Sequence, residues 1–140
     1  MKIVLDTNVL VSGLLSPDAG PGEIVRMVSA GFLSLCYDAR ILSEYKAVLD
    51  RPKFKFASAA VQALLDQVKA HGQSFVGIPL QKPLPDQEDE PFLEVAIAAN
   101  VICLVTGNMK HFPKESGQGI NVMKPADFLE LYRRNKSSNR

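Results

Sequence analysis

Apolar residues follow two different patterns along this chain. In some places they form short uninterrupted runs, which are typical of strands buried on both faces of a parallel sheet. In the longer segments between these runs they recur every three or four residues, as on one face of a helix. The runs predict strands at residues 3–5, 32–37, 74–78, 101–105 and 120–123.

The helical segments have recognisable starts and stops. Pro21 and Pro125 stand where a helix can begin, and Gly31 stands where one can end. Asp38 is a suitable N-cap for the helix that follows the second strand. Helices are therefore predicted to start near residues 8, 21, 39, 61, 91 and 125.

Strands that alternate with helices predict an α/β protein. We expect a three-layer α/β/α fold around a central, mainly parallel sheet of four or five strands. A chain of 140 residues is long enough for one domain with its own core. We place that domain at residues 1–132 and expect a polar tail at 133–140 that frays.

Composition and charge exclude several classes of protein. The net charge of +1 excludes a strongly basic nucleic-acid binder, so any RNA contact needs a local basic surface. No apolar run approaches the roughly 18 to 20 residues of a membrane span, and the N-terminus lacks the apolar stretch of a signal peptide. Cys36 and Cys103 have no metal-ligand spacing and read as two reduced core thiols. We expect a cytoplasmic protein without a membrane partner.

Polar residues follow two of the predicted strands directly. Ligands of open parallel sheets bind at the carboxyl ends of the strands, and there the chain has residues 6–8, Asp-Thr-Asn, and residues 106–108, Thr-Gly-Asn. Two further acids lie on helices. At about 100° per residue, Glu44 falls at the edge of an apolar stripe and Asp89 is in phase with the buried face of its helix. Asp6, Glu44 and Asp89 are therefore expected at the rim of the core.

Each of these residues also has an ordinary role. Asp6 and Asp89 could simply cap helices, Glu44 could be a solvated charge, and Asn108 could be a turn residue. Carboxylates gathered together, however, raise one another's pKa unless a cation joins them. An oxygen-only cluster suits Mg²⁺ or Mn²⁺, and such an ion can activate a water for attack on a phosphodiester.

Four segments resemble those of PIN-domain proteins and occur in the same order. Residues 4–12, Val-Leu-Asp-Thr-Asn-Val-Leu-Val-Ser, resemble the strand that delivers the first Asp of the family. Residues 89–96 resemble its acid-led helix, residues 104–108 its strand ending in Thr-x-Asp or Thr-x-Asn, and residues 124–129 its last strand-to-helix junction. The similarity is strongest to the prokaryotic VapC-type toxins of toxin–antitoxin pairs.

The resemblance implies a metal-dependent endoribonuclease that hydrolyses RNA phosphodiesters with a metal-activated water. Asp6, Glu44 and Asp89 match the acidic positions of the family and would be both catalytic and metal-binding. Asn108 stands where many members have a fourth acid, so we expect it to bind metal more weakly through its carbonyl oxygen. The resemblance also implies a possible antitoxin partner and a homodimer or higher homo-oligomer.

Other polar residues would support the acids. Thr7, Asn8, Ser12 and Thr106 could orient the carboxylates or a metal-bound water. Asp86 is the alternative to Asp89, because the acidic stretch 86–90 leaves the register open by one turn.

Several cations stand in loops or at helix ends and could hold RNA phosphates, and Phe54 or Phe112 could stack on bases. These cations are Lys53, Lys55, Lys110, His111, Lys114 and Lys124. We favour Lys53, Lys55, Lys110 and Lys114 as RNA-binding residues. His111 has no acid–base partner visible in the sequence, so no chemical role is expected for it.

Three alternatives compete with a nuclease. A PIN domain that binds RNA or a protein without cutting is favoured by the missing fourth acid at Asn108. A phosphohydrolase of the haloacid dehalogenase type would use Asp6, Thr106 and Lys124, but its second Asp is replaced by Asn8. A nucleotide-binding domain needs a glycine-rich loop after the first strand, which residues 6–10 do not provide.

Overall fold

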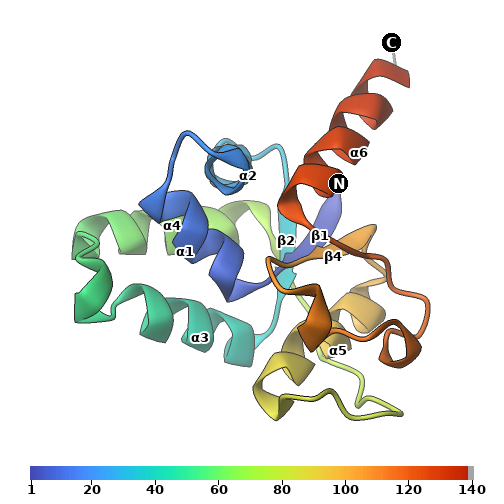
Figure 1. The fold of residues 1–140 in the computed structure, drawn as a ribbon. Helices are drawn as coiled ribbons and strands as arrows, with labels where there is room; N and C mark the ends of the chain where they lie inside the picture. The colour runs from blue at the N-terminus through green and yellow to red at the C-terminus, as the bar shows by residue number, and fades with distance from the viewer. Residues whose placement is uncertain (139–140) are drawn as a thin grey trace.

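The computed structural model describes residues 1–138, which form a five-stranded parallel sheet and six α-helices (Figure 1). The strands are β1 (Lys2–Leu5), β2 (Ser34–Tyr37), β3 (Gln73–Ser74), β4 (Cys103–Val105) and β5 (Val122–Met123). The helices are α1 (Thr7–Leu15), α2 (Gly20–Ser29), α3 (Ala39–Leu49), α4 (Ser58–His71), α5 (Glu90–Ala99) and α6 (Pro125–Ser138). Four 3₁₀ turns interrupt the connections: η1 (Pro52–Phe54), η2 (Gln87–Asp89), η3 (Met109–His111) and η4 (Lys114–Ser116).

The sheet has the strand order β3-β2-β1-β4-β5, and all neighbouring strands are parallel. β1 lies in the centre, with Ile3 opposite Leu35 of β2 and opposite Cys103 of β4. The pairing of β1 with β4 continues to Leu5 and Val105. The residues that follow these two strands, Asp6 and Thr106, are therefore neighbours at the carboxyl end of the sheet. The predicted parallel α/β sheet is confirmed.

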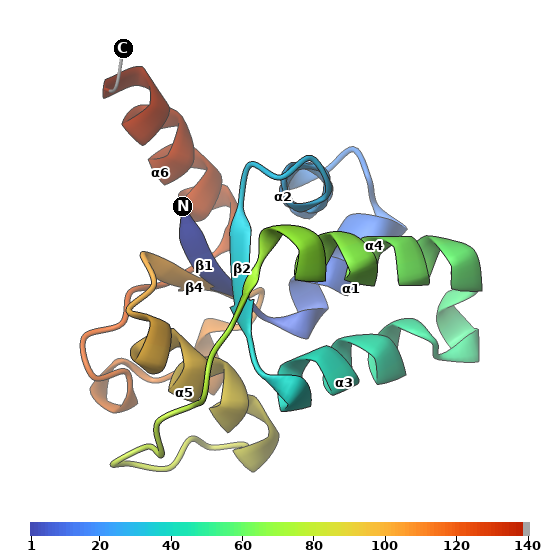
Figure 2. The same cartoon turned by 180° about the vertical axis from the view of Figure 1, so that it is seen from behind.

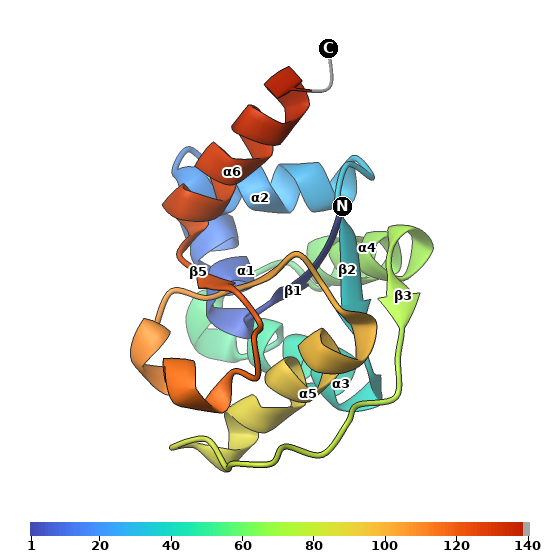
Figure 3. The same ribbon diagram turned by 90° about the vertical axis from the view of Figure 1, so that its right-hand side faces the viewer.

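Helices cover both faces of the sheet. Helix α5 contacts β1, β2 and β4 from one side, whereas α1 to α4 lie together on the other side (Figures 1 and 2). Helix α6 starts against β4 and α2 and then extends away from the body of the protein (Figure 3). The arrangement has the three layers that the alternation of strands and helices predicts.

The core lies where the apolar runs and stripes predict it. Ile3, Val4 and Leu5 are fully buried, as expected for the central strand of a sheet that is covered on both faces. The residues at helical spacing in α4, which are Val61, Leu64, Leu65 and Val68, are all buried. Tyr45 of α3 is also buried, and its hydroxyl donates to the backbone oxygen of Leu5. This bond ties α3 to the strand that carries Asp6.

The two cysteines are unpaired and buried, as predicted. Cys103 belongs to β4, and burial raises the pKa of its thiol to about 12. Burial also raises the pKa of Cys36 in β2. Both thiols are thus protonated packing groups at neutral pH.

Some expected boundaries are wrong. The strand predicted at 74–78 is only Gln73–Ser74, because the chain beyond it leaves the sheet. The strand predicted from residue 32 starts at Ser34, and Phe32 is exposed. The tail expected to fray from Arg133 is helical through Ser138, while residues 139–140 of that tail lie outside the described residues.

Within residues 1–138, no helix is both long and apolar enough to span a membrane.

Candidate functional site

Asp6 lies at the carboxyl end of the central strand with only 5% of its surface exposed. Its Oδ2 accepts a hydrogen bond of 2.8 Å from the hydroxyl of Thr106, at the end of β4. The same hydroxyl accepts a bond of 3.0 Å from the backbone N–H of Asn108. Asp6 precedes α1 in the N-cap position, yet its side chain forms no capping hydrogen bond. The hydrogen bond that fixes its Oδ2 therefore comes from the residue that follows the neighbouring strand.

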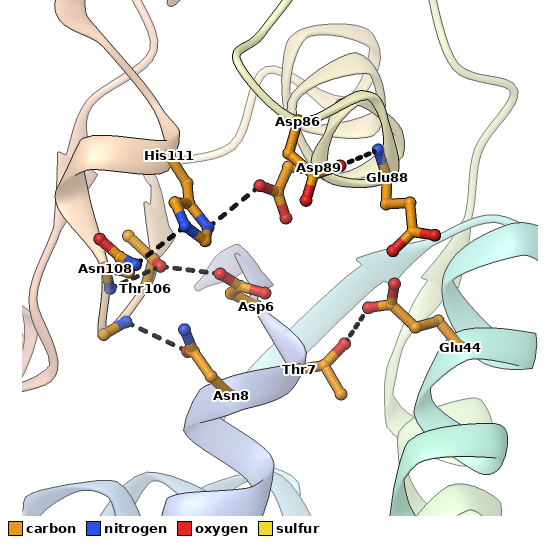
Figure 4. Close-up of polar contacts among 11 residues, drawn as sticks. Asp6, Thr7, Asn8, Glu44, Asp86, Glu88, Asp89, Thr106, Asn108 and His111 are labelled. Carbon is orange, nitrogen blue, oxygen red and sulfur yellow. Dashed lines mark hydrogen bonds and ion pairs between the residues drawn. The ribbon is translucent and has the colours of Figure 1, made fainter.

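Glu44 approaches the same region from α3. Its Oε2 accepts a hydrogen bond from the hydroxyl of Thr7, which directly follows Asp6. Glu44 is partly buried, in agreement with its predicted place at the edge of the apolar stripe. Figure 4 shows its carboxylate on the side of the site opposite His111.

Asp89 is the third acid and comes from the start of α5. It occupies the N-cap position of this helix but forms no capping hydrogen bond. Its side chain is 14% exposed, and Oδ2 lies 3.1 Å from Nδ1 of His111. This contact has the distance of an ion pair but not the geometry of a hydrogen bond, so Oδ2 remains a buried oxygen without a hydrogen-bond donor.

The structure also distinguishes Asp89 from Asp86. Asp86 is exposed and caps η2, since its Oδ1 accepts from the backbone N–H of Glu88 at 2.9 Å. Figure 4 shows Asp89 on the side of Asp6 and shows the side chain of Glu88 extending toward Glu44. Glu88 was not singled out from the sequence. An exposed acid within the stretch 86–90 gave no periodic signal that could have identified it.

The charge of Asp6 raises the pKa values of the other two acids. Burial raises the pKa of Asp6. The hydrogen bond from Thr106 and the backbone N–H groups of Thr7 and Asn8 lower this pKa, but by less. The pKa of Asp89 is raised to about 6, first by burial and then by the charge of Asp6, although His111 lowers it.

Burial likewise raises the pKa of Glu44, and the charges of Asp6 and Glu88 add to this while the bond from Thr7 opposes it. The site is thus short of positive charge.

The amide side chains take different positions around the acids. The Oδ1 of Asn8 accepts from the backbone N–H of Gly107 at 3.1 Å, which joins α1 to the loop after β4. The Nδ2 of Asn108 lies 2.9 Å from Nε2 of His111, and Figure 4 shows its carbonyl oxygen turned away from Asp6. Ser12 is exposed on α1, and none of the described hydrogen bonds joins its side chain to the acids.

His111 has the acid partner that the sequence did not reveal. The expectation that it lacks one is wrong, because η3 turns its ring toward the start of α5. The amide of Asn108 lies against Nε2 of the same ring, so Nδ1 is the ring nitrogen that faces Asp89. No sequence spacing relates positions 89 and 111, so only the fold could bring them together.

The predicted RNA-binding lysines lie in two separate loops and are exposed. Lys53 and Lys55 belong to the connection between α3 and α4, where Lys53 lies over the ring of Phe54. Phe54 itself stacks on Phe56 with 5.5 Å between ring centroids. Lys110 and Lys114 belong to the β4–β5 connection, and Lys124 precedes α6.

The suggestion that Phe112 offers an open stacking surface is wrong. Its side chain is only 4% exposed and belongs to the hydrophobic core.

The donors of this site fit a hard divalent cation. Three carboxylates from three elements converge with raised pKa values, and one buried oxygen of Asp89 has no hydrogen-bond donor. Oxygen donors of this kind suit Mg²⁺ or Mn²⁺. Within residues 1–138, no three acid, His or Cys side chains already stand close enough to hold an ion.

Fold and site together define an α/β protein with an acidic site at the carboxyl end of a parallel sheet. A family profile described as PIN domain matches residues 2–110. The chain therefore belongs to the PIN domain family, as the sequence motifs predicted. PIN domains are generally nucleases, which supports a hydrolase and leaves no basis for the phosphohydrolase and nucleotide-binding alternatives.

The fold is also similar to that of a solved structure. A chain of VapBC2 from Rickettsia felis, bound to a DNA fragment from their promoter, superposes with a TM-score of 0.56. The match covers 89% of this chain and 98% of the other at 15% sequence identity, so it concerns the fold alone. No curated protein matches the sequence.

Proposed function

We propose that this protein is a metal-dependent endoribonuclease of the PIN type that hydrolyses RNA phosphodiesters. Membership of the family supports a nuclease. The observation that carries the proposal is the gathering of three carboxylates around Asp89, whose pKa is raised by burial and by the charges of Asp6 and Glu44 although His111 lies 3.1 Å from its Oδ2. A fold that needed Asp89 only as a helix cap would have used this carboxylate for capping.

In this proposal Asp6, Glu44 and Asp89 hold Mg²⁺ or Mn²⁺. When bound, the ion would lower the pKa of an attacking water and neutralise charge on the phosphodiester. Thr106 fixes one oxygen of Asp6, and Thr7 fixes one oxygen of Glu44, so each acid keeps a second oxygen for the cation. Burial of Asp6 keeps its carboxylate in one orientation.

Asn108 and His111 act together in the proposal. The amide of Asn108 contacts Nε2 of His111, and this contact holds Nδ1 toward Asp89. His111 thereby supports the charged form of Asp89, in accordance with the lowering of the Asp89 pKa by His111. For Asn108 to bind the cation itself, as the sequence suggested, its amide would have to turn its carbonyl oxygen toward Asp6.

The test is cleavage of labelled single-stranded RNA with Mn²⁺, with Mg²⁺ and with EDTA. We expect cleavage that needs metal and is lost in Asp6→Asn. Asp18→Asn is the matched control, because Asp18 is exposed in the loop between α1 and α2. RNA that stays intact with several substrates at high protein concentration would refute the nuclease.

A PIN domain that binds RNA or a protein without cutting is the second candidate. The observation that favours it is the contact of the Asn108 amide with His111, at the position where a fourth acid would add charge. This candidate predicts RNA binding that is indifferent to millimolar Mn²⁺. If the protein does not cleave RNA but Asn108→Asp does, the missing acid at position 108, and not a disrupted site, explains the lack of cleavage.

The biological setting that we propose is a toxin–antitoxin pair. The similarity in fold to a chain of VapBC2 supports an antitoxin partner. The unpaired thiols Cys36 and Cys103 support a reducing compartment, the cytoplasm. A homodimer or higher homo-oligomer belongs to the same proposal, and sedimentation at several concentrations, with and without a co-expressed partner, tests it.

A further inference from the structure

A pocket lies in the connection between β4 and β5, next to the turn that carries His111. Its volume is about 380 Å³, which is within the range of roughly 300–1,000 Å³ typical of small-ligand pockets. Its lining is about evenly polar and apolar, and Met109, Phe112, Ile120 and Val122 form the apolar part. Phe112 belongs to the hydrophobic core.

The turn η3 separates this pocket from the acids. Its last residue, His111, faces Asp89, whereas its first residue, Met109, lines the pocket. Asn108, which precedes the turn, contacts both Thr106 and His111. A ligand that spans η3 would therefore meet the acid site with one part and the pocket with the next.

Gly117 keeps the pocket open. Its backbone is in the ordinary right-handed helical region with φ −80°, so no conformational reason requires glycine there. A Cβ added at this position would meet no atom closer than 3.5 Å. The position is buried and lines the pocket, so a larger side chain would use space on the pocket side.

The residues around the mouth of the pocket have an excess of lysines and include one amide side chain. Residues 107–124 contain Lys110, Lys114 and Lys124 against the single acid Glu115, in a chain whose net charge is only +1. Lys114 and Asn121 both line the pocket and are exposed. A pocket that combines apolar side chains with an amide and a cation suits a flat, polar-edged ring joined to a phosphate.

We propose that this pocket takes one unstacked base of a single-stranded RNA, with an adjacent phosphate directed across η3 to the acids. The inference rests on the proposed function, because it assigns a substrate subsite to the same site. Lys114 contacts the phosphate on the pocket side, and Asn121 reads the edge of the base. Single-stranded RNA is the substrate class that can present an unstacked base in this way.

The test is an NMR titration of protein labelled at the methyl groups of Met, Ile and Val, in EDTA. The probes are the four nucleoside 5′-monophosphates and ribose 5-phosphate, which has the sugar and phosphate without a base. We expect the nucleotides to shift the methyl signals of Met109, Ile120 and Val122, and ribose 5-phosphate to leave them unchanged. Gly117→Leu should weaken the binding about tenfold, or about 1.4 kcal/mol, because the added side chain would take space that the base needs, whereas Gly117→Ala should bind like the original protein.

Equal shifts with ribose 5-phosphate, or nucleotide binding that Gly117→Leu leaves intact, would overturn the proposal. If Gly117→Leu does not fold, Asn121→Ala takes its place, with Asn135→Ala on α6 as control. Asn121→Ala should then weaken binding and alter the preference among the four bases, and an unchanged profile would count against the pocket. The titration scores binding without metal, so nucleotide binding by a protein that cuts no RNA would refute the nuclease but not the pocket.

Discussion

The junctions β1–α1 and β2–α3 have the same pattern in the sequence but different roles in the structure. Each consists of a buried strand, one aspartate and a helix, and the two strands are adjacent in the sheet. Asp38 caps its helix, since its Oδ1 accepts from the backbone N–H of Ile41 at 2.9 Å. Asp6 does not cap and accepts instead from Thr106.

The difference comes from the neighbours of each aspartate. Asp38 has Arg40 two residues away, and the guanidinium lies 2.7 Å from its Oδ2. Asp6 has no arginine or lysine paired with it in the described residues; the charge of His111 lowers its pKa, and Asp6 in turn raises the pKa values of Asp89 and Glu44. One carboxylate is therefore satisfied and structural, whereas the other is held in place and left in need of a cation.

The largest expected effect is on cleavage. Asp6→Asn should lower the rate of RNA cleavage about a thousandfold, the order of loss for one group that stabilises charge in the reaction. Asp38→Asn should change the rate by less than about threefold, because Asn also caps helices well. Initial rates with Mn²⁺ measure both. Equal losses would mean that the two junctions do not differ in function.

The next effect is on the pH dependence of stability in EDTA. The folded-state pKa of Asp89 is about 6 against 3.8 for the ordinary group, so the folded protein binds the proton more tightly. This contribution to the free energy of unfolding is complete below pH about 4 and is lost as the pH rises through 6. Its size is at most roughly 3 kcal/mol. Urea unfolding between pH 4 and 8 measures it.

Asp89→Asn is the variant that sharpens this result. It should flatten the pH dependence between pH 4 and 8, because the group that titrates is removed. Asp86→Asn should retain most of the slope, since Asp86 is exposed and caps η2. A slope unchanged in Asp89→Asn would show that other groups carry it.

Bound metal should raise the free energy of unfolding by an amount comparable to, or smaller than, the effect of pH. Mn²⁺ at a hundred times its Kd should add about 2.7 kcal/mol to the free energy of unfolding, and more at pH 8 than at pH 5 because the acids are then charged. Thermal unfolding with and without Mn²⁺ measures the effect as a rise in Tm. Asp6→Asn should abolish the rise and Asp38→Asn should keep it. A rise that survives in Asp6→Asn would place the ion elsewhere.

The smallest expected effect concerns the structural aspartate. Asp38→Ala removes the cap of α3 and the partner of Arg40, and should cost about 1 kcal/mol of stability. The free energy of unfolding in urea at pH 7 measures this loss. Asp50→Ala is a suitable control, because Asp50 is an exposed residue at the other end of the same helix. A loss no larger than in the control would mean that the cap is unimportant.

The sequence by itself determined the parallel sheet, because apolar runs without alternation can only be buried on both faces. It also determined that Asp6 and Thr106 each follow a buried strand, and it predicted Glu44 at the edge of an apolar stripe and Asp89 in phase with the buried face of its helix. These results depend on local periodicity, which reaches over a few residues. Helix boundaries were less certain, as the helical segment beyond Arg133 demonstrates, since polar residues form an exposed helix as readily as a tail.

Only the tertiary structure decided how each polar group is used. Asp6 and Asp38 look alike in the sequence, and Asp86 and Asp89 differ by less than one turn, yet one of each pair caps a helix and the other does not. His111 meets Asp89 because η3 folds back toward α5. Hydrogen bonds and ion pairs act over a few ångströms, so their partners are fixed by the packing of segments that are far apart in the chain.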